Sequence, residues 1–150
     1  MNLPLPLAGF TGIPGLASHP WAYPALEVLH IVGIALLLGN LVLLELRVWG
    51  LAPALPLQPL ARLALSLSLS GFGLLLLSGG LMFLAQPVEL LSNGAFLLKL
   101  DLILLAGCNA AWFHVRGGLA RPDGLARAQT LVSLGLWLGV IICGRWIAYL

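Results

Sequence analysis

The chain has 150 residues, of which 61% are hydrophobic and 8% are charged, and its mean hydropathy is +1.07. Soluble domains contain about 25% charged residues, so this composition indicates an integral membrane protein. The net charge of +2 and the lack of a long basic run argue against nucleic-acid binding. The length suits one domain, and the lipid bilayer is its expected surrounding.

Residues 1–23 are expected to form an arm at the membrane interface. They contain no positively charged stretch ahead of their apolar residues, and prolines interrupt them, so they do not read as a cleaved signal peptide. We expect this arm to pack on the helix ends through Phe10 and Trp21.

The remaining residues, 24–150, are predicted to form an all-α transmembrane four-helix bundle with up-down-up-down topology. About 20 apolar residues span a bilayer core, because each helical residue rises about 1.5 Å. The expected helices cover residues 24–49, 60–86, 95–115 and 125–150. Between the second and third helices we expect a loop, with Ser92 or Asn93 as the N-cap of the third helix and Asp123 as that of the fourth.

Basic residues are distributed unequally between the two ends of the predicted bundle. Five flank the first and third loops, namely Arg47, Arg62, Arg116, Arg121 and Arg127, whereas Lys99 and Arg145 belong to the other end. Because basic loops stay in the cytoplasm, both termini and the second loop are expected on the outer side.

Small and sulfur-containing residues in the helices suggest packing roles. Ser66, Ser70, Gly73 and Gly80 recur at helical spacing and predict a stripe where another helix approaches closely. Cys108 and Cys143 fall at different depths, so we expect two free thiols rather than a disulfide.

The first helix carries a polar stripe that contains the main candidate site. Glu27 and His30 are three residues apart and therefore share a helical face, and Lys99 enters at a similar depth from the third helix. Ionisable groups in a membrane are costly unless they pair or serve a ligand. One interpretation is a Glu27–Lys99 ion pair with His30 hydrogen-bonded nearby, and the other is a ligand or cofactor site at the outer mouth.

A second polar set lies at inner depth and is interpreted as structural. Asn40 and Asn109 are expected to hydrogen-bond between the first and third helices. Glu45 and Arg47 are further structural polar residues, and His114 is expected at the interface. His30 and His114 should be about 20 Å apart along the membrane normal, so they do not ligate one iron.

The ordered motifs resemble those of an uncharacterised family of small bacterial four-helix membrane proteins. They are W-x-Y-P-x-x-E-x-x-H-x-x-G in residues 21–33, G-N-L-V-L-L-E-L-R-V-W-G in residues 39–50, and N-G-A-F-L-L-K-L-D in residues 93–101. The resemblance implies a bacterial inner-membrane protein with matched positions at Glu27, His30, Lys99 and Asn109, and no established activity. The first expected helix, which contains His30, also resembles more loosely the helices of copper-resistance membrane proteins and membrane b-type cytochromes.

Three functional classes follow from these residues. The first is a non-enzymatic protein whose outer pocket, formed by Glu27, His30 and Lys99, binds a small ligand such as a quinone headgroup, or an accessory subunit of a homo-oligomer or larger membrane complex. The second is a haem b electron carrier with His30 as axial ligand and Met82 or His19 as the second ligand. The third binds or transports a metal ion through Glu27 and His30, whose E-x-x-H spacing occurs in di-metal proteins. No nucleophile–base pair appears, so an enzyme is not predicted.

Overall fold

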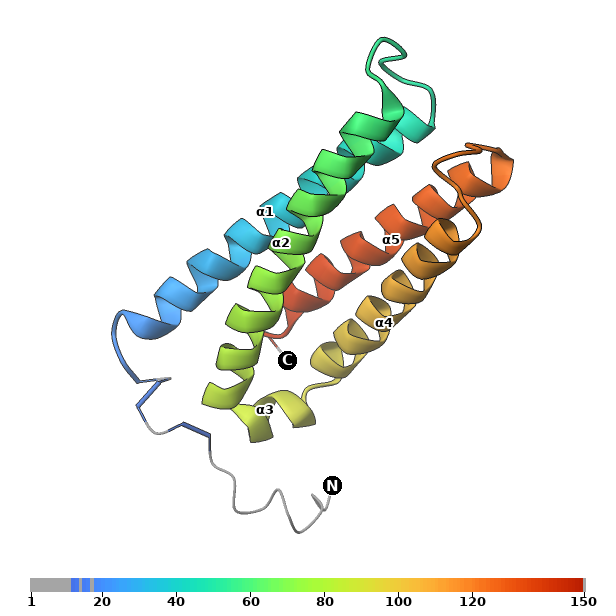
Figure 1. Ribbon diagram of the computed structural model, residues 1–150. Helices are drawn as coiled ribbons and strands as arrows, with labels where there is room; N and C mark the ends of the chain where they lie inside the picture. The colour runs from blue at the N-terminus through green and yellow to red at the C-terminus, as the bar shows by residue number, and fades with distance from the viewer. Residues whose placement is uncertain (1–11, 14, 17, 150) are drawn as a thin grey trace.

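The computed structural model describes residues 12–13, 15–16 and 18–149, and within them every regular element is helical (Figure 1). The helices are α1 (Ala22–Val48), α2 (Leu57–Ala85), α3 (Pro87–Ser92), α4 (Gly94–Val115) and α5 (Gly124–Trp146). All but α3 are long and apolar enough to cross a membrane. The chain is therefore an all-α, multi-pass membrane protein, as its composition predicts.

The four long helices form two hairpins that lie side by side (Figure 1). α1 packs against α2 and α4 against α5, whereas the backbones of the two hairpins approach each other through α1 and α5. The connections 49–56 and 116–123 lie together at one end, which we term the loop end, and α3 lies at the other, which we term the α3 end (Figure 1). Side chains join the hairpins through two aromatic contacts, Phe72 with Trp137 and Phe83 with Phe96.

Both expected N-caps are confirmed. The Asn93 side-chain oxygen accepts hydrogen bonds from the backbone N–H groups of Ala95 at 3.0 Å and Phe96 at 3.2 Å. Asp123 accepts one from Ala126 N at 2.8 Å. These bonds pair backbone donors that a helix start leaves without partners, which is why α4 and α5 begin close to their predicted positions.

Residues 87–92 were expected to lie in a loop, and this expectation is wrong because they form α3. Pro87 occupies the first turn, where its missing N–H needs no partner, and Glu89 provides an acidic group in the same turn. The Ser92 hydroxyl then donates to Glu89 O at 2.8 Å. Proline here ends α2 and also begins the next helix.

The described part of the N-terminal arm lies against the α3 end of α2. Ile13 N donates to Leu84 O at 2.9 Å, and Gly12 lies so close to this helix that an added Cβ would be 2.8 Å from Ala85 O. Trp21 does not anchor the arm, since 78% of its surface is exposed. Phe10 lies outside the described residues.

Small residues bring α1 and α2 together, but they are not the predicted ones. Ser66, Ser70 and Gly80 are exposed, whereas the buried small residues of α2 include Ala64, Ser68, Gly71 and Ser78. The two sets have the same internal spacing and differ by two positions, which turns the stripe by about 200° around the helix. The period was predicted correctly and the buried face was wrong.

Candidate functional site

His30 is held at the contact between α1 and α2. Its Nδ1 lies 2.9 Å from the hydroxyl oxygen of Ser78, a residue that is 2% exposed. The neighbouring Gly79 leaves room for the imidazole, because a Cβ at that position would lie 3.2 Å from His30 Cε1. A hydroxyl and a glycine on one turn of α2 therefore position this ring.

The hydrogen bonds of Ser78 define the tautomer of His30. The Ser78 hydroxyl lies 2.7 Å from Leu74 O and donates its single proton to that carbonyl, as helical serines commonly do. It then accepts from His30 Nδ1–H, so we assign the proton to Nδ1 and a lone pair to Nε2. No described residue bonds Nε2. This nitrogen is left free to accept a proton donor or to ligate a metal.

Lys99 brings a cation from α4 to the same region. Its ammonium lies within electrostatic range of the His30 ring. On its other side it packs over Gly144 of α5, where an added Cβ would be 3.6 Å from Nζ. Within residues 18–149 the ion pair is formed by Arg116 and Asp123, so Lys99 has no carboxylate partner there.

Glu27 does not complete a buried triad with these residues. It lies one turn before His30 on α1 with an exposed side chain. The alternative ion pair with Lys99 is wrong for the described residues, since the backbones of α1 and α4 do not come into contact. The structure thus places Lys99 within electrostatic range of His30, and Glu27 forms no ion pair within the described residues.

The metal and haem alternatives depend on further ligands beside His30. No group of three His, Cys, Asp or Glu side chains gathers as a metal site in the described part of the chain. His19 uses Nδ1 to accept from the backbone of Trp21 and Ala22, so it caps α1 instead of approaching His30. Met82 lies one turn beyond Ser78 on α2. For haem, the free Nε2 of His30 fits one axial bond, and Met82 is the remaining candidate for the second.

The predicted bond between Asn40 and Asn109 is wrong. The Asn40 amide donates to Leu36 O of its own helix at 2.7 Å, and the Asn109 amide donates to Gln129 O of α5 at 2.9 Å. Because the hairpins approach through α1 and α5, Asn109 finds its partner on its own neighbour. Asn109 therefore joins α4 to α5 and not to α1.

A cavity of about 50 Å³ lies near the loop end, and α1, α4 and α5 supply most of its lining. Its polar lining residues are Glu45, Asn109, His114, Gln129, Thr130 and Ser133. Trp49 bridges α1 to α5 beside it by donating its indole N–H to the Thr130 hydroxyl at 2.8 Å. Glu45, Asn109 and His114 of the inner polar set therefore line one small, partly open space.

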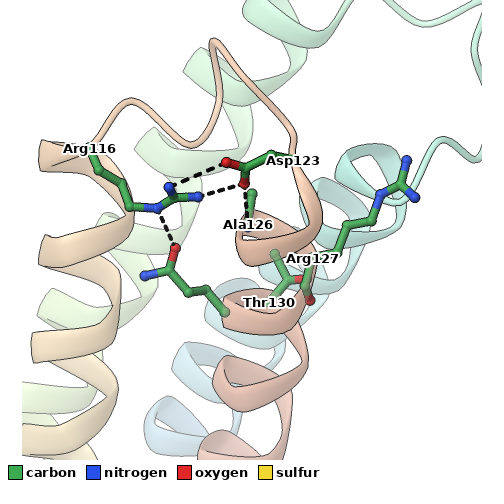
Figure 2. Close-up of polar contacts among 6 residues, drawn as sticks. Arg116, Asp123, Ala126, Arg127 and Thr130 are labelled. Atoms are coloured by element: carbon green, nitrogen blue, oxygen red, sulfur yellow. Dashed lines mark hydrogen bonds and ion pairs between the residues drawn. The ribbon is translucent and has the colours of Figure 1, made fainter.

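Arg116 closes this end of the α4–α5 hairpin (Figure 2). It forms a two-pronged contact with Asp123 at 2.7 and 3.4 Å, and its Nε donates to Gln129 Oε1 at 2.8 Å. The hydrogen bond from Arg116, followed by that from the Ala126 backbone, lowers the pKa of Asp123 below its ordinary value. Arg127 points away from this contact (Figure 2). Arg47 instead binds the first loop through Leu55 O at 2.7 Å.

Sequence reasoning missed the α5 contributions to this region. Gln129 and Ser133 are four residues apart in α5, a spacing that places both on one face. That spacing was available as a signal. The contribution of Ser78 was also missed, because serines in membrane helices are common packing residues and their partners depend on the tertiary fold.

Within the described residues, the fold and these two polar regions define an α-helical membrane protein with four candidate spans and titratable groups inside its bundle. Comparison with protein-family models, curated proteins and solved structures finds no match to the chain. The family resemblance drawn from its motifs therefore stays a prediction.

Proposed function

We propose that this protein binds the headgroup of a small ligand such as a quinone near the α3 end of its bundle, through His30 and Lys99. The observation that carries the proposal is the oriented imidazole, whose Nδ1–H is taken up by Ser78 and whose Nε2 lone pair has no partner among the described residues. Oriented, unpaired polar groups in an apolar setting are typical of ligand sites.

The two groups have complementary hydrogen-bonding capacities. His30 Nε2 accepts, so it suits a hydroxyl of a reduced headgroup, whereas the Lys99 ammonium only donates, so it suits a carbonyl or an anionic oxygen. A quinone and its reduced form present these groups on one ring. Glu27 is exposed and lies one turn nearer the start of α1 than His30. It would therefore orient the bound species from the rim of this site.

The experiment measures binding of a short-chain benzoquinone to the detergent-purified protein by isothermal calorimetry. His30→Ala should weaken binding about fivefold, because one hydrogen bond is worth about 1 kcal/mol and 1.4 kcal/mol is a tenfold change. Gly79→Ala should also weaken it by crowding the ring, while Gly80→Ala, where a Cβ meets nothing within 4 Å, is its matched control.

If His30→Ala binds the quinone as the parent does and loses only thermal stability, His30 is a packing residue and the proposal fails. A visible absorption spectrum of the parent separates the haem alternative. A Soret band in the parent that is lost in His30→Ala would identify haem b, not a quinone, as the ligand of His30. Bound metal that is lost in the same variant would favour the metal alternative.

We further propose that the loop end lies in the cytoplasm of a bacterial inner membrane. This end carries Arg47, Arg62, Arg116, Arg121 and Arg127, and basic loops are retained on the cytoplasmic side. Single cysteines at Ala120 and Ser92 of a variant lacking the native thiols test this orientation. An impermeant maleimide applied to intact cells should label position 92, and labelling of position 120 instead would reverse the assignment.

A further inference from the structure

The cavity near the loop end has the size and lining of a hydration site. A cavity of about 10–15 Å³ by this measure holds one water molecule if it offers 2–4 polar partners. The space of about 50 Å³ therefore accommodates a few water molecules, and polar side chains reach it from α1, α4 and α5. Neither His30 nor Lys99 lines it, so it is distinct from the site proposed above.

Gln129 supplies an unpaired donor to this cavity. The residue is 4% exposed. Its side-chain oxygen accepts from Arg116 and its backbone oxygen accepts from Asn109, but its Nε2 has no partner among the described residues. Thr130 beside it is already occupied, since its hydroxyl accepts from Trp49 and donates to Arg127 O. Because a buried donor without a partner loses its hydrogen bonds to water, an acceptor from outside the chain is favoured here.

Glu45 supplies the complementary acceptor from α1. Its side chain is half-buried and lines the same cavity, where Ser133 of α5 approaches its carboxyl group. The ion pair within the described residues joins Arg116 to Asp123, and Glu45 has no cationic partner among them. A water molecule that accepts from Gln129 Nε2 and donates to Glu45 would satisfy both groups at once.

We propose that this cavity holds ordered water and that Glu45 takes up and releases a proton through that water from the loop end. In the uptake step a hydronium ion at the loop end gives up a proton and becomes water, and the proton passes through the cavity water to the carboxylate, which becomes a neutral carboxyl group. In the release step the carboxyl group returns the proton to water at the loop end. A lone carboxylate among apolar helices is costly, which favours such exchange over permanent charge.

The groups facing Glu45 from the packed helices are few. From α4 the cavity is lined by His114, which is exposed and connects it to the loop end, together with the uncharged Asn109. From α5 the lining residues are the uncharged Gln129, Thr130 and Ser133, and from α2 the lining residue is Leu65. His114 is thus the second titratable group of this cavity.

Infrared difference spectroscopy of the full-length protein during a pH titration tests the proposal. The parent should show a protonated-carboxyl C=O band that titrates and shifts in D2O. Because the other carboxyl groups also absorb when protonated, the parent spectrum is compared with that of each variant. Glu45→Gln should remove one component of the band, whereas Glu27→Gln, which removes an exposed carboxyl of the same helix, should retain that component. A band that Glu45→Gln leaves unchanged, or a component that Glu27→Gln removes as well, overturns the proposal.

The bound water is tested by its O–H stretching signal, identified by its shift in H2¹⁸O. Gln129→Leu should abolish this signal by removing the unpaired donor. Because that variant also loses the Arg116 contact, Ser133→Ala provides a milder change one turn further along the same face of α5 and should shift the signal. A parent without an isotope-sensitive signal, or a signal unchanged in both folded variants, overturns the hydrated site.

Discussion

Replacing Gly71 by alanine should force α1 and α2 apart at their closest crossing. A Cβ at this position would lie 2.7 Å from Leu37 N and 2.9 Å from Gly33 O, both of them backbone atoms of α1. Ordinary van der Waals contact begins at 3.4 Å, so the nearest atoms must separate by about 0.7 Å. Backbone atoms cannot rotate aside as a side chain can, and the whole crossing must therefore shift.

The magnitude follows from a comparison with Gly73→Ala in the same helix. A Cβ at Gly73 meets nothing within 4 Å, so this control gains the helix propensity of alanine, about 1 kcal/mol, without a clash. Gly71→Ala gains the same stabilisation from helix propensity, but its overpacking lowers the unfolding free energy by about 1–3 kcal/mol. The difference in unfolding free energy between the two variants should therefore be about 1–3 kcal/mol, with Gly73→Ala more stable.

Reversible unfolding in mixed detergent micelles, followed by far-ultraviolet circular dichroism, measures this difference. Gly33→Ala should also destabilise the protein, since its Cβ would lie 3.0 Å from Gly71 O. The double variant should lose less than the sum of the single losses, because one separation of the helices relieves both clashes. Equal stabilities for Gly71→Ala and Gly73→Ala would refute the close crossing of α1 and α2.

Three further outcomes are expected. Trp49→Phe should lower the unfolding free energy by about 1 kcal/mol, because it removes the hydrogen bond to Thr130 that joins the hairpins; an unchanged value would reject that bond. Asn93→Ala should cost about 1 kcal/mol by removing the N-cap of α4, and equal melting temperatures would reject the cap. The Arg116 contact lowers the pKa of Asp123 below 3.8, so its stabilisation is fully present above that value and is lost as the pH falls through the lowered pKa. The melting-temperature difference between the parent and Asp123→Asn should accordingly shrink on acidification, and a constant difference would contradict the argument.

Matched substitutions separate these effects from general damage. Trp112→Phe alters an exposed tryptophan and should leave the unfolding free energy unchanged. Asp101→Asn removes an exposed carboxylate that has no ion pair in the described chain, and it should not change the acid dependence of the melting temperature.

The sequence by itself determined the membrane class, the four spans and the helix start at Asp123, and it limited the other N-cap to Ser92 or Asn93. These properties depend on local chemistry. Apolar length sets a span whatever its neighbours are, and a capping side chain bonds backbone groups two or three residues away. The same reasoning missed α3, because Pro87 both ends one helix and suits the first turn of another.

Only the tertiary structure decided which residues meet. The serine and glycine spacing of α2 fits two faces that differ by two positions, and burial against α1 selects the face with Ser68 and Gly71. Depth arguments placed Asn40 and Asn109 at one level, yet depth does not specify which helices are neighbours, and the hairpin arrangement gives them different partners. The oriented ring of His30 and the unpaired amide of Gln129 likewise depend on residues 48 and 13 positions away, respectively. Contacts over such separations are set by packing of the hairpins, and a single sequence carries no local signal for them.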